Sequence, residues 1–139
     1  MRISVRFMVM AVVLAWAGGV APAWAEKCLN YEPATVTLSG KVRMVWAYGP
    51  PGFGEDPAHD RQGEYAVMDL DTPACLAAGD GDAVARSAVA SMQLISTKGQ
   101  KFDRGLLGVH VIISGRLWPR ESGGVTDVLF DYATVRSSP

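Results

Sequence analysis

The sequence predicts an all-β protein, a small closed barrel of five strands that follows an export signal. Residues 109–118 (VHVIISGRLW) alternate apolar and polar side chains and then break at a glycine, which is typical of a long, bent β-strand. Residues 36–42 repeat the pattern V-x-[LI]-S-G-[KR]-[VL] that occupies residues 111–117, so the chain makes the same bent strand twice. Two bent strands of this kind indicate a sheet that closes on itself.

Residues 1–25 have the composition of a secretory signal peptide. Arg2 and Arg6 precede an apolar run, and the sequence APAWA fits the small-residue rule for cleavage after Ala25, although cleavage two residues earlier also fits. We expect residues 26–139 to form a single domain that is periplasmic or secreted. No later apolar run approaches the roughly 20 residues that a membrane helix needs, so we expect no membrane span in the mature form.

The balance of charges argues against a nucleic-acid partner. The chain has 13 basic and 14 acidic residues, and two of the basic ones are lost with the signal peptide, which leaves a mature net charge of about −3. Phosphate contacts need clustered lysine and arginine side chains, and the sequence has no such cluster. The sequence therefore predicts neither a nucleic-acid partner nor a cofactor.

Both cysteines lie in the mature part, which an export signal would deliver to an oxidising compartment. We therefore predict a disulfide between Cys28 and Cys75. The chain-entropy model gives such a cross-link roughly 4 kcal/mol of stabilisation. Two unpaired structural thiols are the alternative, and catalytic redox use is disfavoured because the C-x-x-C spacing is absent.

The first strand is expected over residues 35–46. Val36 and Leu38 face the same side and Gly40 supplies the bend, beyond which the inward set continues with Val42, Met44 and Trp46. A second strand is expected over residues 63–70, ending in a turn at 71–73.

Antiparallel pairing of these two strands provides an internal check on the predicted disulfide. The end of the second strand would lie beside the start of the first, which brings Cys75 next to Cys28. The same pairing leaves the connection between the two strands at the opposite end of the hairpin.

That connection, residues 47–62, predicts a long loop, since it holds three prolines and three glycines and has almost no periodicity. Long loops in compact domains are often functional, and this one carries aromatic and charged side chains. The alternative interpretation is a mobile linker between two strands.

Three further strands are expected at residues 89–95, 108–118 and 125–136. The first of these also fits a helix. Before it, residues 76–87 begin as a polar turn in which Asp82 would cap a short helix through Ala88. Residues 97–107 form a connection with room for a helical turn. Five strands with bends in the first and fourth match the oligonucleotide/oligosaccharide-binding (OB) barrel, and a small β-sandwich is the alternative.

Several segments resemble one bacterial exported family, called domain of unknown function 4431. The segments are CLNYEPATVTLSG at 28–40, PGFG near Pro51, LDTPAC at 70–75, MQL at 92–94, VIISGRL at 111–117 and TDVL at 126–129. The resemblance implies an exported small domain and no particular activity. Family members often carry histidines in the turn between the last two strands, where this chain has RESGG, so no metal or catalytic role is carried over to that turn.

We expect the mature protein to be a binding module and not an enzyme, one that recognises an envelope protein or a glycan through the loop 47–62 and the adjoining barrel face. The two bends are each followed by a tryptophan, which predicts aromatic side chains near the barrel rim, although core positions are the default for aromatics in strands. The predicted contact residues are Trp46, Tyr48, Phe53, His59, Arg61 and Trp118. Matching polar candidates are Lys41, Arg43, Arg116 and Arg120, for which a solvated face is the simpler interpretation.

A small metal-assisted hydrolase centred on His59 is the alternative function. Glu55, Asp56 and Asp60 supply carboxylates in the same loop, and His110 would join them if the fold brought it close. A loop rich in proline and glycine positions side chains poorly, however, and no H-x-x-x-H or Cys/His spacing is present. We therefore predict no metal site and expect His110 to be hydrogen-bonded on the outer face of its strand.

Overall fold

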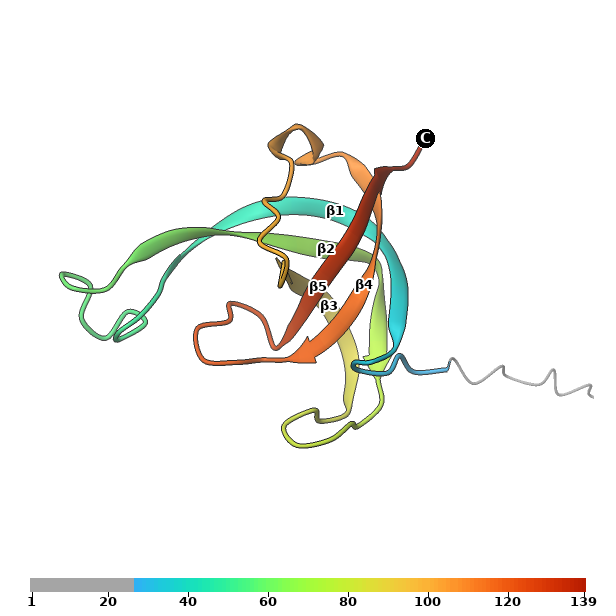
Figure 1. Cartoon of the computed structure of the whole chain (residues 1–139), viewed down its shortest axis with the longest axis horizontal. Helices are drawn as coiled ribbons and strands as arrows, with labels where there is room; N and C mark the ends of the chain where they lie inside the picture. The colour runs from blue at the N-terminus through green and yellow to red at the C-terminus, as the bar shows by residue number, and fades with distance from the viewer. Residues whose placement is uncertain (1–26) are drawn as a thin grey trace, which may run out of the picture.

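The computed structural model of the chain describes residues 27–139 and is an all-β domain in which five strands close into one ring (Figure 1). The predicted signal peptide, residues 1–25, lies outside the described residues. The strands are β1 (Thr35–Tyr48), β2 (Gln62–Leu76), β3 (Arg86–Ile95), β4 (His110–Pro119) and β5 (Val128–Ser137). Their order around the ring is β1-β2-β3-β5-β4, and only the β3–β5 pair is parallel. The predicted five-stranded OB-like barrel is confirmed.

The two repeated sequence patterns are hydrogen-bonded neighbours. β1 and β4 run antiparallel with Leu38 opposite Ile113, and the pairing places the valine of each pattern opposite the glycine of the other, Val36 against Gly115 and Gly40 against Val111. The two copies of the pattern are therefore related by a local two-fold arrangement, centred on the pair Leu38 and Ile113.

Both glycines of this arrangement stand where no side chain fits. A Cβ atom at Gly40 would overlap the backbone carbonyl of Asp69 on β2, and one at Gly115 would overlap the backbone carbonyl of Asp131 on β5. Each glycine thus lets a neighbouring strand approach closely at the bend, as the sequence predicts for Gly40.

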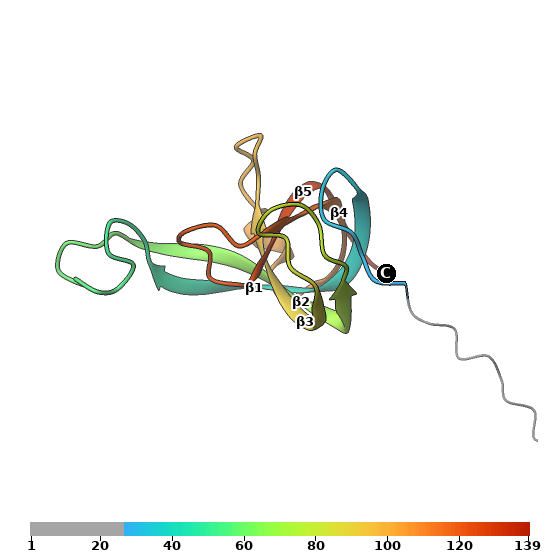
Figure 2. The same ribbon diagram turned by 90° about the horizontal axis from the view of Figure 1, so that it is seen from below.

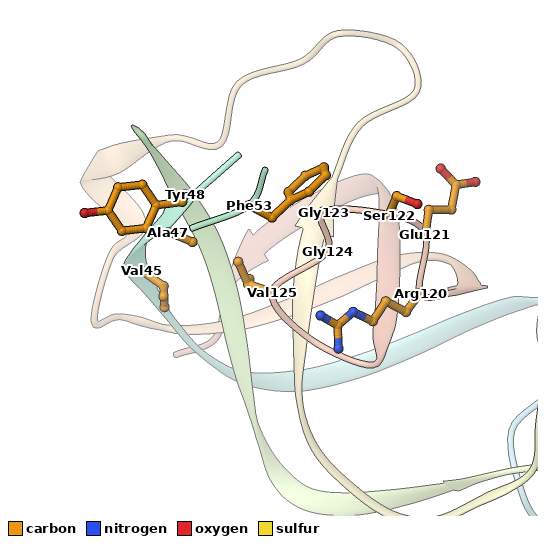
Figure 3. Close-up of a pocket in the computed structure, with 10 residues that line it drawn as sticks. All are labelled: Val45, Ala47, Tyr48, Phe53, Arg120, Glu121, Ser122, Gly123, Gly124 and Val125. Carbon is orange, nitrogen blue, oxygen red and sulfur yellow. The ribbon is translucent and has the colours of Figure 1, made fainter. Parts of the chain in front are cut away.

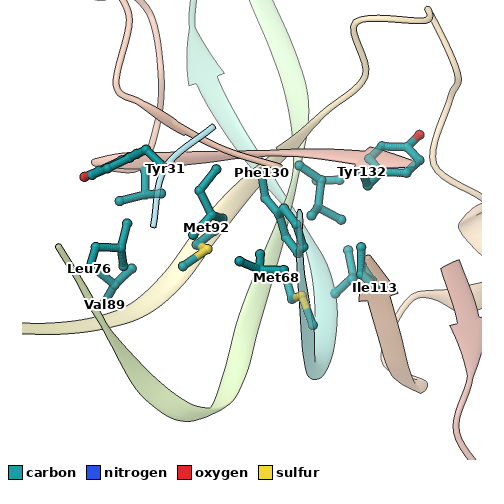
Figure 4. Close-up of a cluster of buried hydrophobic side chains, with 14 of the residues drawn as sticks. Tyr31, Met68, Leu76, Val89, Met92, Ile113, Phe130 and Tyr132 are labelled. Carbon is teal, nitrogen blue, oxygen red and sulfur yellow. The ribbon is translucent and has the colours of Figure 1, made fainter. Parts of the chain in front are cut away.

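The core fills the inside of the ring with side chains that alternate along each strand. Phe130, Met68, Met92 and Ile113 are fully buried there (Figure 4). Tyr132 closes one end of this core, and its hydroxyl donates to the carbonyl of Gln100 at 2.9 Å.

The predicted disulfide is present and ties the N-terminal segment to the end of β2. Cys28 and Cys75 are bonded with their Cα atoms 4.7 Å apart. Leu29 donates its N–H to the carbonyl of Cys75, and its own carbonyl accepts from the N–H of Ala77, both at 2.8 Å. The hairpin geometry inferred from the sequence is therefore confirmed.

The structure corrects several element boundaries. β1 continues to Tyr48 and β2 begins at Gln62, so the connecting loop is 49–61 and not 47–62. β2 passes through the predicted turn at 71–73, because shifts of register against β3 accommodate this stretch inside the strand. β5 begins at Val128 and not at residue 125.

The predicted helix from Asp82 to Ala88 is wrong. Residues 79–84 form tight turns, in which Ala83 donates to the carbonyl of Asp80, and β3 begins at Arg86. Ala83 is buried, which holds this short segment against the domain. The helical turn expected between residues 97 and 107 is present as a 3₁₀ turn, η1 (Arg104–Leu106).

Across residues 27–139, no helix is long and apolar enough to cross a membrane.

Candidate functional site

Beyond the closed ring, β1 and β2 continue as a two-stranded ribbon. Residues 44–48 pair with residues 62–66, and the β1–β4 and β2–β3 ladders end before this stretch. Figure 2 shows the ribbon reaching away from the barrel and ending in the loop 49–61. This loop and its ribbon are the most protruding part of the described chain.

One buried carboxylate organises the loop 49–61. The side chain of Asp60 accepts the backbone N–H groups of Gly52 at 2.6 Å, Gly54 at 2.7 Å and Asp56 at 3.2 Å. Partial removal from water opposes ionisation of this carboxyl, but the three donors outweigh that effect and hold its pKa below the ordinary value. Although rich in glycine and proline, the loop is therefore a defined structure built around one anion.

The same loop presents an aromatic side chain toward the neighbouring loop. Phe53 has a positive φ of 52° and is 44% exposed, and the following Gly54, with a φ of 102°, lies against the ring of Tyr48. The ring of Phe53 lies against Gly123, so closely that a Cβ atom there would overlap it. Two segments that are 70 positions apart in the sequence thus meet without a strand between them.

The second loop, residues 120–127, is held on the outside of the barrel. Val125 donates its N–H to the side-chain oxygen of Gln93 at 2.8 Å, and the N–H of Gln93 donates to the hydroxyl of Thr126 at 2.7 Å. Val67 and Leu129, the strand partners of Gln93, are also buried, although they do not belong to the central core. The loop 120–127 therefore has a small hydrogen-bonded attachment of its own on the sheet.

Between the two loops lies a cleft of about 570 Å³ (Figure 3). Its apolar part comes from the ribbon and from Phe53, and its polar part comes from the loop 120–127. The lining residues are Val45, Ala47, Tyr48, Phe53, Arg120, Glu121, Ser122, Gly123, Gly124 and Val125. An open cleft with one apolar wall and a few polar groups suits a ligand that is only partly apolar.

Arg120, which lines the cleft, and Arg86, which does not, approach the same carboxylate. Nη1 of Arg120 lies 3.5 Å from one oxygen of Asp127, and Nη1 of Arg86 lies 3.0 Å from the other oxygen. Two positive charges therefore share one negative charge at this point.

The structure brings only two of the predicted contact residues into the cleft. Tyr48 and Phe53 line it, whereas Trp46 is 67% exposed beside a separate, smaller depression of about 200 Å³ that it shares with Tyr48 and Gln62. Arg61 is exposed and does not line the cleft. The Trp46 side chain is thus accessible but lies outside the cleft.

Trp118 does not line the cleft either. It is half-buried on β4, and its indole N–H is buried without a hydrogen-bond partner among the described residues. The two tryptophans that follow the repeated pattern therefore do not form one aromatic site.

His59 lies on the outside of the loop and is hydrogen-bonded to Asp56, with Nδ1 2.6 Å from the carboxylate. Asp60, which the hydrolase alternative needs as a neighbour, is directed into the loop and occupied by N–H groups. His110 instead pairs with Asp71 at 2.5 Å, as expected for a hydrogen-bonded residue on β4. Within the described part of the chain, no group of three His, Cys, Asp or Glu side chains is arranged to hold a metal ion.

Sequence analysis missed most of the loop 120–127 as part of the site, although Arg120 was among the polar candidates. The residues look like an ordinary polar turn, and their position depends on contacts with Gln93 and Phe53, which are distant in sequence. The OB topology itself was the available signal, since the β1–β2 and β4–β5 loops lie together in that barrel.

No protein-family model, curated protein or solved structure matches the chain. The resemblance to the domain of unknown function 4431 family stays a prediction.

Proposed function

We propose that the mature protein is a non-catalytic binding module, periplasmic or secreted, that holds an envelope protein or a glycan in the cleft between the loops 49–61 and 120–127. The observation that carries this proposal is the contact of Phe53 with Gly123. Two loops that are each fixed by their own hydrogen bonds meet there beside an open, partly apolar cleft.

The rigidity of both loops supports binding, because a surface that is already ordered loses little conformational entropy when a partner arrives. Exposed aromatic side chains also supply large contact area, and Phe53 and Tyr48 are 44% and 38% exposed. Catalysis at His59 has less support, since Asp60 is directed into the loop and the hydrogen bond between His59 and Asp56 is exposed to solvent.

The test is capture of ligands from envelope extract by the exported, tagged protein, with Phe53→Ala as the site variant. Val84→Ala is the matched control, since Val84 is 51% exposed and lies outside the cleft. We expect Phe53→Ala to lose the captured protein or glycan at unchanged melting temperature, and Val84→Ala to retain it. Equal capture by both variants would place the binding surface elsewhere.

A further inference from the structure

We propose that the ligand of this cleft carries an anionic group, a carboxylate or a phosphate, which Arg120 binds, next to an apolar body that lies on the ribbon and Phe53. This inference rests on the proposed binding function and names the chemistry of its ligand. It follows from the placement of Arg120, from the donors of its guanidinium that have no partner among the described residues, and from the apolar wall opposite.

Arg120 is held in position and directed into the cleft. Its backbone N–H donates to the carbonyl of Asp127 at 3.1 Å, and its aliphatic stem lies against Gly124, where a Cβ atom would be 3.3 Å from Cγ of the arginine. Figure 3 shows the guanidinium on the side of Arg120 that faces Val125. The backbone and stem of Arg120 are therefore fixed at the edge of the cleft, and its guanidinium is accessible to a ligand.

Most of the donors of Arg120 are still available. A guanidinium has five N–H groups, and in the described part of the chain only Nη1 approaches an acceptor, Asp127, at the long distance of 3.5 Å. Asp127 lies closer to Arg86, at 3.0 Å. The planar fork of Arg120 thus remains free for a carboxylate or phosphate, the groups that it matches best.

The guanidinium of Arg120 has no carboxylate of its own. Its partner, Asp127, is shared with Arg86, which lies closer to it. Glu121 is the one acidic residue among the ten that line the cleft, and its side chain points away from the guanidinium of Arg120 (Figure 3). An anionic group on a ligand would give Arg120 a partner of its own.

The opposite wall defines the rest of the ligand. Val45 and Ala47 of the ribbon supply small apolar side chains, and Phe53 supplies an exposed ring. Val125 adds an apolar side chain from the loop 120–127. A ligand that was only a small anion would leave this wall in contact with water. An anionic group joined to an acyl chain, an aryl ring or an apolar side chain uses both parts of the cleft.

The experiment uses 8-anilinonaphthalene-1-sulfonate, an aromatic anion that fluoresces in apolar surroundings, titrated into the protein purified after export. Arg120→Met should raise the dissociation constant of the probe about tenfold or more, as expected for the loss of a charge-assisted hydrogen bond. Arg120→Lys keeps the charge but not the planar fork, so it should weaken binding less than Arg120→Met does. Arg136→Met is the matched control, since Arg136 is exposed at the far end of β5, and it should change the affinity less than twofold.

Competition then separates the ligand classes. We expect octanoate or octyl phosphate to displace the probe at concentrations at which octanol does not, and the stronger of the two anions identifies the preferred group. If octanol competes equally well and only Phe53→Ala weakens binding, the anionic group is wrong while the proposed function stands. If neither Arg120→Met nor Phe53→Ala weakens binding, or the probe does not bind, both the anion inference and the proposed cleft are wrong. Circular dichroism and thermal melting verify that each variant is folded.

Discussion

The two halves of β1 differ in how much structure surrounds them. Residues 35–41 pair with β4 as part of the closed ring, and the pairing with β2 begins at Gly40, whereas residues 44–48 pair with β2 alone. Val36 and Val42 are buried, while Trp46 and Tyr48 near the end of the strand are 67% and 38% exposed. One end of β1 therefore packs in the core and the other end is exposed to solvent. Substitutions in the closed ring should mainly change stability, and substitutions toward the ribbon should mainly change binding.

The largest effect is expected where the closed ring has no space. Gly115→Val should destabilise the domain by about 4 kcal/mol or more and prevent accumulation of folded protein, because the side chain would displace the backbone of β5. Urea denaturation and the yield of exported protein measure this effect. Gly81→Asn is the control, since nothing lies within 4 Å of its Cβ position and asparagine tolerates its φ of 60°. Two variants of equal stability would contradict the close approach at the bend.

The next effect concerns the cross-link at the base of the ring. Replacing Cys28 and Cys75 together by alanine should cost about 4 kcal/mol of stability, since the disulfide restricts the unfolded chain. Urea denaturation of the oxidised protein, the reduced protein and the double variant measures the loss. Probe binding at saturating ligand should persist in whatever fraction remains folded, because the cleft lies on the ribbon side of the molecule. Loss of binding in folded double variant would show that the disulfide also supports the cleft.

The smallest effect on global stability, and the most specific for the loop, is expected at Asp60. Asp60→Asn should accelerate amide hydrogen exchange of Gly52 and Gly54 about tenfold while the exchange of barrel amides stays unchanged, because the charged acceptor is lost. Glu55→Gln, an exposed substitution in the same loop, is the control.

Acid should have the same effect as Asp60→Asn in the wild-type protein. The pKa of Asp60 is lowered in the folded loop, so its contribution is complete above the ordinary pKa of an aspartate and is lost as pH falls through the lowered value. Exchange of the two glycine amides, corrected for the intrinsic pH dependence, should therefore increase only at strongly acidic pH. An increase near neutral pH would contradict the role assigned to this carboxylate.

Much of the barrel was predictable because its signals are local. Alternation of apolar residues located all five strands, and the hairpin inferred from them brought Cys28 and Cys75 together. The helix predicted at 82–88 was wrong because the backbone around Asp82 forms tight turns, and the chain after Val84 enters β3.

The candidate site was only partly predictable, because it depends on contacts between distant segments. Tyr48 and Phe53 were identified from the composition of one loop. The approach of Gly123 to Phe53, and the attachment of Val125 to Gln93, are set by how the ring closes and have no local signature. Trp118 was expected at the rim from its place after a repeated pattern, but the local two-fold arrangement relates only the patterns themselves and not the residues that follow them.

That local two-fold arrangement also protects the alignment of the strands against slippage. A shift of β1 by two residues would preserve the alternation of inner and outer side chains, so hydrophobicity alone would tolerate it. Such a shift would bring Leu38 or Val42 to the position of Gly40, against the carbonyl of Asp69, where only a hydrogen atom fits. Gly115 imposes the same condition on β4 and β5. Gly40 thus fixes the register of β1 against β2, and Gly115 fixes the register of β4 against β5.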